Sequence, residues 1–332
     1  MRRGDGQGAG WYGTLGRPAF FALPPEASHR VAIALLGLPL PWERIAGAER
    51  NPALGVELCG IPLPNPIGLA AGFDKACRRL GALGRLGFGF VVGGTVTRHP
   101  RRGNPKPRIV RDRDRRAIVN AMGMPNPGAE AAARSLARAP RTAPRFVSVA
   151  DEAIDDALAA CDLLAPHADA IELNASSPNA PWRHDPEHLR RLLDAFRAHT
   201  DRPLLLKLPP FSGEEERAGA LGVARDAVDA GVSGLVCSNT LPVEEPRLAA
   251  GRGGLSGGPL TALTPEIVRD VAAATGRAVP IVACGGILTV EDVRACLRAG
   301  AIAVEVYTGL IYRGPGIVGE LTRGLLRDGP GA

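Results

Sequence analysis

Only three of the forty lysine and arginine residues in this chain are lysines, and each lies in a distinctive local sequence. Lys75 follows Ala-Gly-Phe-Asp, Lys106 lies within Gly-Asn-Pro-Lys-Pro-Arg, and Lys207 ends a run of three leucines. A lysine presents a compact ammonium on a flexible stem, whereas an arginine presents a wide planar fork. In a chain that otherwise uses arginine, these three lysines are candidates for binding or catalysis. For Lys106, an ordinary surface lysine is the open alternative.

Polar residues other than lysine also occur where the apolar runs end. Most carry an amide or a hydroxyl group; carboxylates are almost absent there, and histidine is absent. Such a set suits a planar, hydrogen-bonding ligand with an acidic group, whereas metal-dependent hydrolysis requires clustered His, Asp and Glu. We therefore expect no metal site. The members of the set are Thr95, Asn120, Ser148, Asn174, Ser238, Asn239, Thr240, Tyr307 and Thr308.

Two glycine-containing turns follow the last two apolar runs, at Gly285-Gly286 and Thr308-Gly309. Bare backbone N–H groups at such positions bind phosphate, although either turn alone is equally consistent with a simple tight turn. Taken together with Lys207 and Asn174, they favour a phosphorylated cofactor.

Ser177 lies between two asparagines in the run Asn-Ala-Ser-Ser-Pro-Asn that begins at Asn174 and ends at Asn179. A lone loop serine is usually structural. No histidine ends an apolar run, so the sequence does not indicate a Ser-His-Asp triad. The two flanking asparagines make a functional role for Ser177 more plausible.

The strands and helices that would position these residues can be predicted from a regular alternation in the sequence. Short apolar runs alternate with amphipathic stretches, which indicates a parallel sheet buried on both faces by helices. Eight such units over residues 65–327 predict a (β/α)8 TIM barrel, and a doubly wound open sheet is the alternative. The predicted strands are 67–71, 88–93, 145–149, 168–173, 204–208, 234–237, 281–283 and 303–307. The predicted helices are 74–86, 127–137, 151–164, 185–199, 214–230, 264–275, 289–299 and 315–327.

The first 50 residues differ in composition from the rest. They hold five of the aromatic residues with several arginines, and residues 27–36 read as a short helix ended by Pro39 and Pro41. Aromatic and basic residues on a terminal segment suit a membrane interface, although simple packing on the main domain is equally consistent. We expect a helical extension over 1–50, a lead-in over 51–64, and the barrel domain within 51–332.

Composition bounds the class of protein. The chain has 332 residues, 45% of them hydrophobic and 22% charged, as in ordinary globular proteins. Apolar runs are too short to span a membrane, and we expect no secretory signal. The net charge is +6, but the arginines are scattered among acids and aromatics are few, so nucleic-acid binding is a weak interpretation. Six cysteines without a CxxC pattern indicate a reduced, intracellular protein.

Ten short runs between residues 65 and 309 carry a resemblance to the class 2, quinone-linked dihydroorotate dehydrogenases, which are FMN enzymes of pyrimidine synthesis. Residues 17–40 also resemble the N-terminal helices of class 2, and Ser177 stands where class 1 enzymes have cysteine. The other matching runs are 65–75, 87–89, 94–97, 103–108, 120–123, 174–179, 238–240, 253–257, 285–287 and 307–309.

The resemblance implies a role for each site residue. Ser177 would be the catalytic base that removes the C5 proton of dihydroorotate, while a hydride passes to the flavin. His29 and Arg108 would contact the quinone. The substrate would be held by Lys75, Asn120, Asn174, Asn179, Asn239 and Thr240. FMN would be bound by Ala71, Gly72, Lys75, Thr95, Ser148, Asn174, Lys207, Ser238, Gly257, Gly286, Tyr307 and Thr308, with Lys207 stabilising the reduced anion.

The chain departs from the family pattern at three positions. Ser148 replaces an asparagine that contacts the flavin, and the loop after it is shorter. Met124 and Ala180 replace a phenylalanine and a threonine beside the catalytic serine. The threonine helps to relay the proton, so its loss should slow proton removal unless a water takes its place.

These departures leave two alternatives open: a divergent FMN barrel that acts on another cyclic amide or pyrimidine, and a non-catalytic flavin-binding protein. The resemblance further implies a peripheral protein at the cytoplasmic face of the cell membrane, most simply a monomer that binds no nucleic acid.

Overall fold

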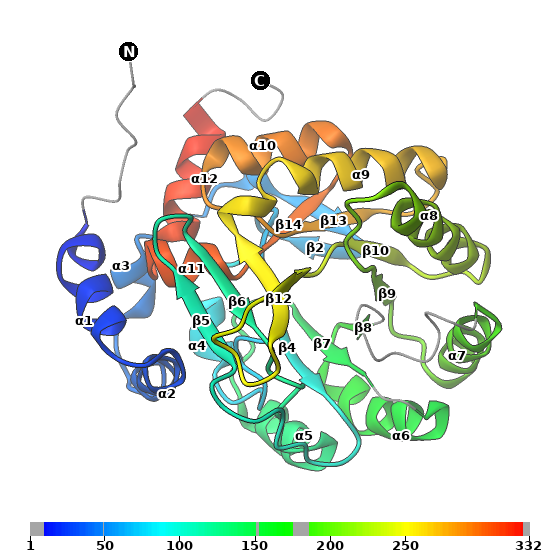
Figure 1. The fold of residues 1–332 in the computed structure, drawn as a ribbon, viewed down its shortest axis with the longest axis horizontal. Helices are drawn as coiled ribbons and strands as arrows, with labels where there is room; N and C mark the ends of the chain where they lie inside the picture. The colour runs from blue at the N-terminus through cyan, green and yellow to red at the C-terminus, as the bar shows by residue number, and fades with distance from the viewer. Residues whose placement is uncertain (1–9, 49, 151–152, 175–185, 328–332) are drawn as a thin grey trace.

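The computed structural model describes residues 10–48, 50–150, 153–174 and 186–327. Within these residues, eight parallel strands close into a barrel in the order β10-β13-β14-β3-β4-β7-β8-β9 (Figure 1). The predicted TIM barrel is therefore confirmed, and the open doubly wound sheet is excluded. The barrel strands are β3 (Ile67–Leu69), β4 (Phe90–Val96), β7 (Arg145–Val149), β8 (Ala170–Asn174), β9 (Leu204–Lys207), β10 (Gly234–Cys237), β13 (Ile281–Cys284) and β14 (Ala303–Val306).

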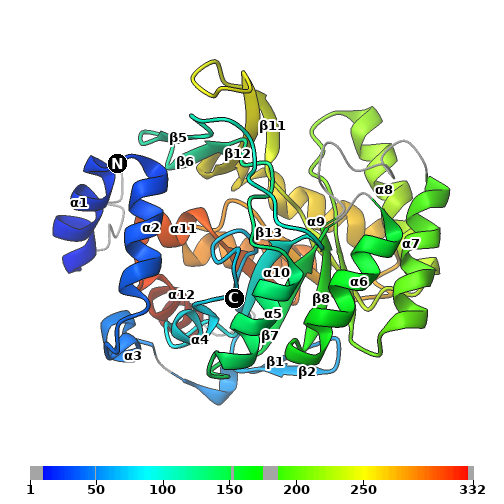
Figure 2. The same cartoon turned by 90° about the horizontal axis from the view of Figure 1, so that it is seen from below.

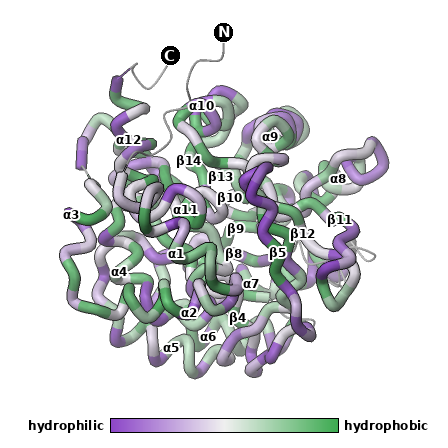
Figure 3. Tube along the Cα trace, turned by 60° about the vertical axis from the view of Figure 1, so that its left-hand side comes forward, coloured by the Kyte–Doolittle hydropathy of each residue, from purple (hydrophilic) through white to green (hydrophobic). Residues whose placement is uncertain are grey.

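Helices surround the barrel on the outside. Because each strand is covered on both faces, the barrel strands are mostly apolar and hydrophilic segments lie at the periphery, as Figure 3 shows. The surrounding helices are α4 (Leu80–Gly84), α5 (Ala129–Arg138), α6 (Ile154–Leu164), α7 (Pro186–His199), α8 (Glu214–Asp229), α9 (Leu263–Ala274), α10 (Val290–Ala299), α11 (Thr308–Arg313) and α12 (Ile317–Arg327).

The predicted helix over 74–86 is wrong in its first half. Residues 72–79 form a loop, and α4 begins only at Leu80. The buried Asp74 organises this loop, since its carboxylate accepts a hydrogen bond from the Arg79 amide and its carbonyl accepts one from Cys77. The loop places Phe73 and Lys75 over the end of the barrel instead of on a helix.

Two small sheets cap the two ends of the barrel, and neither was predicted. Four strands form an antiparallel sheet in the order β11-β12-β6-β5 at one end, and a hairpin of β1 and β2 lies at the other end (Figure 2). Their strands are short and lie in segments that read as loops. They are β1 (Val56–Leu58), β2 (Ile61–Leu63), β5 (Ile109–Asp112), β6 (Ala117–Asn120), β11 (Leu241–Glu244) and β12 (Arg252–Gly257).

The barrel interior is packed with side chains. Phe90 and Phe146 lie at its centre with ring centroids 5.0 Å apart, and Leu58 and Leu63 of the hairpin join the same apolar cluster from below. The barrel is therefore closed at the hairpin end, and access is possible only at the end where the parallel strands terminate.

The N-terminal segment forms short helices at one side of the barrel (Figures 1 and 2). Arg111 of β5 fixes this segment, because its guanidinium stacks 4.5 Å from the Phe21 ring centre and donates a hydrogen bond of 2.7 Å to Ser28. The segment comprises a π-helical turn (Tyr12–Gly16), α1 (Arg17–Ala22), α2 (Pro25–Leu35) and α3 (Trp42–Ala46), followed by a 3-10 turn (Pro52–Leu54).

Candidate active site

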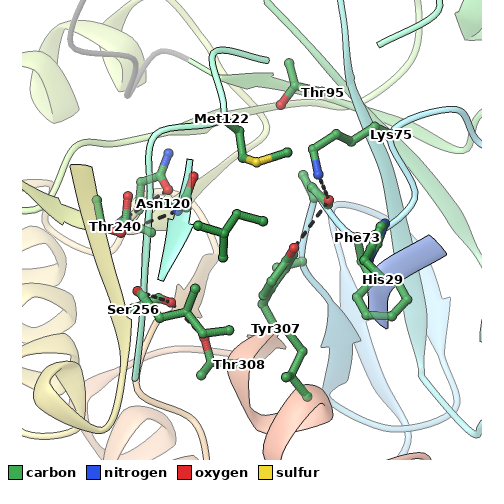
Figure 4. Close-up of a pocket in the computed structure, with 18 of the residues that line it drawn as sticks. His29, Phe73, Lys75, Thr95, Asn120, Met122, Thr240, Ser256, Tyr307 and Thr308 are labelled. Atoms are coloured by element: carbon green, nitrogen blue, oxygen red, sulfur yellow. Dashed lines mark hydrogen bonds between the residues drawn. The ribbon is translucent and has the colours of Figure 1, made fainter. Parts of the chain in front are cut away.

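A cavity of about 1630 Å³ opens where the parallel strands end and extends to the N-terminal helices. It gathers fifteen of the residues singled out from the sequence, contributed by the barrel, the capping sheet and α2 (Figure 4). They are His29, Ala71, Gly72, Lys75, Thr95, Arg108, Asn120, Asn174, Lys207, Asn239, Thr240, Gly257, Gly286, Tyr307 and Thr308.

Four other predicted residues are not in that set. Ser148 and Ser238 are buried and do not line the cavity; the Ser148 hydroxyl lies 3.0 Å from that of Thr95. Ser177 and Asn179 lie outside the described residues, as does Ala180. Met124, the other departure from the family pattern, lines the cavity.

Glycine is required at one wall of the cavity. Gly286 has φ +71°, and a Cβ there would lie 2.4 Å from the Thr261 nitrogen. The backbone after β13 is therefore bare, as close approach of a phosphate requires. Next to it, the hydroxyls of Ser256 and Thr308 are 2.8 Å apart and add polar groups from two further elements (Figure 4).

Lys75 points into the cavity from the loop after β3. Its ammonium donates a hydrogen bond to the Gly72 carbonyl, which the Tyr307 hydroxyl also contacts at 3.5 Å (Figure 4). Burial, and then the nearby Arg108 charge, lower the pKa of Lys75 to about 8. Lys75 is thus mostly charged at neutral pH and suited to bind an anion.

The amide side chains at the same end of the cavity are oriented by the backbone. Asn120 is opposite Gly254 in the pairing of β6 with β12, and its amide donates to the Gly254 carbonyl at 3.4 Å. The Asn239 side chain accepts from the Thr240 amide at 2.8 Å, and Asn174 donates to Thr95 at 3.0 Å. This arrangement presents several fixed donors and acceptors, which suits a planar ring.

The expectation that this region has almost no carboxylates is wrong. Glu305 lines the cavity and Glu172 lies buried beneath it, both close to Lys207. They escaped the sequence analysis because each lies one or two residues before its strand end, within an apolar run. The available signal was a single acidic residue inside each of two strands predicted to be buried, matched by Lys207 within the predicted 204–208 strand.

The far end of the cavity reaches α2. His29 packs edge-on against Phe73 with ring centroids 5.2 Å apart, and Phe73 packs in the same way against Tyr307 at 5.9 Å (Figure 4). Burial lowers the pKa of His29 to about 4, so the imidazole is neutral at pH 7. The His29 side chain therefore faces Phe73 and the cavity.

Arg108 holds α2 against the capping sheet. Its guanidinium binds both carboxylate oxygens of Glu26, at 2.9 and 3.3 Å, and Lys106 lies 3.3 Å from the same carboxylate. Lys106 therefore has a partner, although it is largely exposed. Sequence analysis missed Glu26 and Phe73, because nothing in the sequence shows that α2 lies beside the barrel mouth.

Comparison with known proteins identifies the family. The family described as "Dihydroorotate dehydrogenase" matches residues 53–328. The chain belongs to the dihydroorotate dehydrogenase family. Curated relatives named "Dihydroorotate dehydrogenase (quinone)" include those of Erythrobacter litoralis (41% identical; 95% of this chain and 94% of the relative) and Anaeromyxobacter sp. strain Fw109-5 (42%; 94% and 91%).

Solved structures of this family agree with that assignment. The crystal structure of Eimeria tenella DHODH in complex with ferulenol superposes with a TM-score of 0.79 at 32% identity, covering 93% of this chain and 94% of that one. The predicted membership in the quinone-dependent class of dihydroorotate dehydrogenases, and with it the predicted oxidoreductase activity, is confirmed.

Proposed function

We propose that this protein oxidises (S)-dihydroorotate to orotate in pyrimidine synthesis, with FMN as its bound cofactor and a membrane quinone as the terminal acceptor. The observation that carries the proposal is that one cavity combines a glycine-lined wall, a set of fixed amides with Lys75, and an opening at α2. A cofactor, a small anionic ring and a hydrophobic acceptor each have a suitable region there.

The residues present fit FMN. Gly286 and Gly257 bring bare backbone to the cavity wall, because a Cβ at Gly257 would lie 2.2 Å from the Arg116 carbonyl. Thr308 and Ser256 supply hydroxyls, and Lys207 supplies a buried positive charge. When bound, FMN supplies a two-electron acceptor that the twenty amino acids lack.

The substrate fits the other part of the cavity. Lys75 would bind the carboxylate of dihydroorotate, and Asn120, Asn239 and Thr240 would hold the ring through hydrogen bonds, together with Asn174 and Asn179. Ser177 would take the C5 proton. A serine hydroxyl needs a partner to pass that proton on, and Ala180 offers none, so proton removal should be slow unless a water completes the relay.

The quinone would enter beside α2, where His29 and Arg108 line the cavity. Every large hydrophobic side chain recorded as exposed in the described residues lies within the first 40 residues, including Trp11 (54% exposed) and Leu15 (72%). Such a concentration favours peripheral contact of this segment with a membrane. No helix in the described part of the chain is long and apolar enough to cross a membrane.

Anaerobic titration of the purified protein with dihydroorotate tests the reaction. We expect the FMN absorbance to bleach, and we expect Ser177→Ala to slow bleaching by about 10²-fold or more while orotate still binds. Ala180→Thr should accelerate it by about 10-fold if the relay is incomplete. Bleaching by another cyclic amide but not by dihydroorotate would favour the divergent paralogue. No bleaching with any donor would favour a non-catalytic flavin-binding protein.

A further inference from the structure

Three ionisable side chains converge inside the barrel beneath the cavity, and we call them the acid–lysine cluster: Glu172 of β8, Lys207 of β9 and Glu305 of β14. The Lys207 ammonium lies 2.9 Å from a Glu305 oxygen and 3.7 Å from a Glu172 oxygen. All three residues are almost completely buried, at 1%, 4% and 2% exposed in chain order. Lys207 and Glu305 line the cavity, and Glu172 lies beneath them.

The cluster has one carboxylate more than its single ammonium can balance. With all three groups ionised, a net negative charge would be confined in a space that excludes water, which is strongly unfavourable. Glu305 accepts the hydrogen bond from Lys207 and is the closer of the two carboxyl groups, at 2.9 Å against 3.7 Å for Glu172. Glu172 is left over, and its buried Oε1 accepts no hydrogen bond from any described residue. One added proton would make the cluster neutral.

Burial and Glu305 favour a proton on Glu172, whereas Lys207 and the Ser148 hydroxyl oppose it. Burial raises the pKa of Glu172 to about 8; the Lys207 charge opposes this rise and the Glu305 charge adds to it. Burial alone would lower the pKa of Lys207, but its acidic neighbours raise it well above the usual value, so the ammonium persists. Cys284 of β13, the other titratable neighbour, stays a neutral thiol because burial raises its pKa.

A row of hydroxyl and amide groups leads from Glu172 to the cavity. Ser148 is directly opposite Glu172 in the pairing of β7 with β8, and its hydroxyl acts to lower the pKa of the Glu172 carboxyl. The Ser148 hydroxyl lies 3.0 Å from that of Thr95, which accepts from Asn174 at 3.0 Å. Thr95 and Asn174 line the cavity. Hydroxyls both donate and accept, so this row can pass a proton.

We propose that the acid–lysine cluster is a one-proton site, with the proton held on Glu172 at neutral pH and exchanged with the cavity through Ser148 and Thr95. The site would set the charge that the protein presents beneath the FMN ring. In its protonated form the cluster is neutral, and after loss of the proton it is negative. This role for Glu172 rests on the proposed binding of FMN and is that of a positioning residue, which acts on the cofactor through Lys207.

The proton can be observed directly by infrared spectroscopy of the purified, oxidised, FMN-containing protein. We expect a carbonyl band of a protonated carboxylic acid at pH 7 that disappears as the pH rises through about 8. Glu172→Gln should abolish the band. Glu305→Gln should abolish it too, because Glu172 then becomes the only partner of Lys207 and ionises. Glu266→Gln, at an exposed position of α9, is the matched control and should retain it.

Transfer to D2O tests the route of the proton. The band should shift to its deuterated position more slowly in Ser148→Ala than in the wild type. An unchanged exchange rate would show that the hydroxyl row is not the route. A band that persists in both Glu172→Gln and Glu305→Gln, or that is absent from the wild type, would overturn the proton site itself. Because two variants predict the same loss, failure of one to fold leaves the other decisive.

The reduction potential of the bound FMN gives a second readout. Added negative charge in the cavity raises the proton affinity of a nearby carboxylate, so the reduced protein should keep its proton to higher pH. Below pH 8, reduction by two electrons takes up one proton, which goes to FMN. Above pH 8 it takes up a second proton, on Glu172, so the potential should fall with pH about twice as steeply. Glu172→Gln should give one slope throughout, and a bend in that variant would contradict the proposal.

These outcomes separate the inference from the proposed function. A protein that carries FMN, shows the band and the bend, and is not reduced by dihydroorotate would disprove only the substrate. A protein that dihydroorotate reduces but that shows neither band nor bend would disprove only the one-proton site.

Discussion

Lys75 and Lys207 share one cavity but differ in what balances their charge. Lys207 has two carboxylates within 3.7 Å, whereas Lys75 donates to a neutral carbonyl and is repelled by Arg108. Burial lowers the pKa of both lysines, but the acidic neighbours of Lys207 raise its pKa above the usual value, so the two net shifts are opposite. Of the two lysines, Lys75 has a charge available for an incoming anion. Anion binding at Lys75 should therefore depend on pH.

We expect orotate binding to weaken in alkaline solution because of Lys75. The pKa of Lys75 in the free protein is about 8, so the ammonium is present below pH 8 and is lost as the pH rises through that value. The Kd should increase by about tenfold per pH unit above 8. Lys75→Met should bind orotate weakly at every pH. Lys106→Met, which removes a largely exposed ammonium, should keep the wild-type profile; a flat profile in the wild type would contradict the role of Lys75.

A comparison of two glycines tests whether the cavity wall at Gly286 binds FMN. Gly286 and Gly276 both have positive φ, at +71° and +59°, so alanine at either position costs about 1 kcal/mol of backbone strain. Only at Gly286 would the added Cβ meet a backbone nitrogen at 2.4 Å; Gly276 has nothing within 4 Å. Gly286→Ala should therefore purify with much less FMN, measured by absorbance, than Gly276→Ala. Equal FMN content in the two variants would argue against this wall as the cofactor site.

At the scale of elements, α2 and the capping sheet form the rim of the cavity together. The contacts that join them are polar and specific: Glu26 with Arg108, and Ser28 with Arg111. The same N-terminal segment also exposes large apolar side chains. These exposed side chains are the ones available for the proposed membrane contact.

Replacement of three exposed apolar residues of this segment, Leu15, Val31 and Leu38, with serine tests the membrane contact. We expect less binding to phospholipid vesicles and slower turnover with a long-chain quinone, because apolar burial drives interfacial binding. Bleaching of FMN by dihydroorotate should not change.

The control for that experiment replaces three exposed residues of α8, Glu215, Arg225 and Asp229, with serine. This helix lies on the other side of the molecule from α2 (Figure 1), and vesicle binding should be unaffected. Equal vesicle binding by the two triple variants would show that the N-terminal segment does not contact the membrane.

At the scale of the whole molecule, the two ends of the barrel have different roles. The hairpin of β1 and β2 closes one end with apolar side chains, and the loops and capping sheet at the other end form the cavity. Changes at the hairpin should therefore affect stability more than chemistry.

Leu58→Ala tests this division. Leu58 is completely buried in the interior cluster, so its truncation should lower the free energy of unfolding by about 2–5 kcal/mol. Denaturant unfolding measures that loss, while the FMN spectrum and the rate of bleaching should stay near wild type at 25 °C. The exposed neighbour Glu57→Ala should change neither quantity. A large loss of bleaching in folded Leu58→Ala would show that the two ends are coupled.

The sequence by itself determined the barrel and fifteen of the residues that line the cavity. Parallel strands buried on both faces produce continuous apolar runs, and the active-site residues of a barrel follow those runs directly, so local pattern was sufficient for Lys75, Asn174 and Gly286. The sequence could not determine what depends on residues distant in the chain. Glu172, Lys207 and Glu305 come from three strands, and only closure of the barrel brings their side chains within 4 Å. The ion pair of Glu26 with Arg108, 82 residues apart, depends likewise on where α2 packs. Charge balance in a buried site is a property of all the groups that share the space, which is why only the tertiary structure revealed an unbalanced carboxyl beneath the cavity.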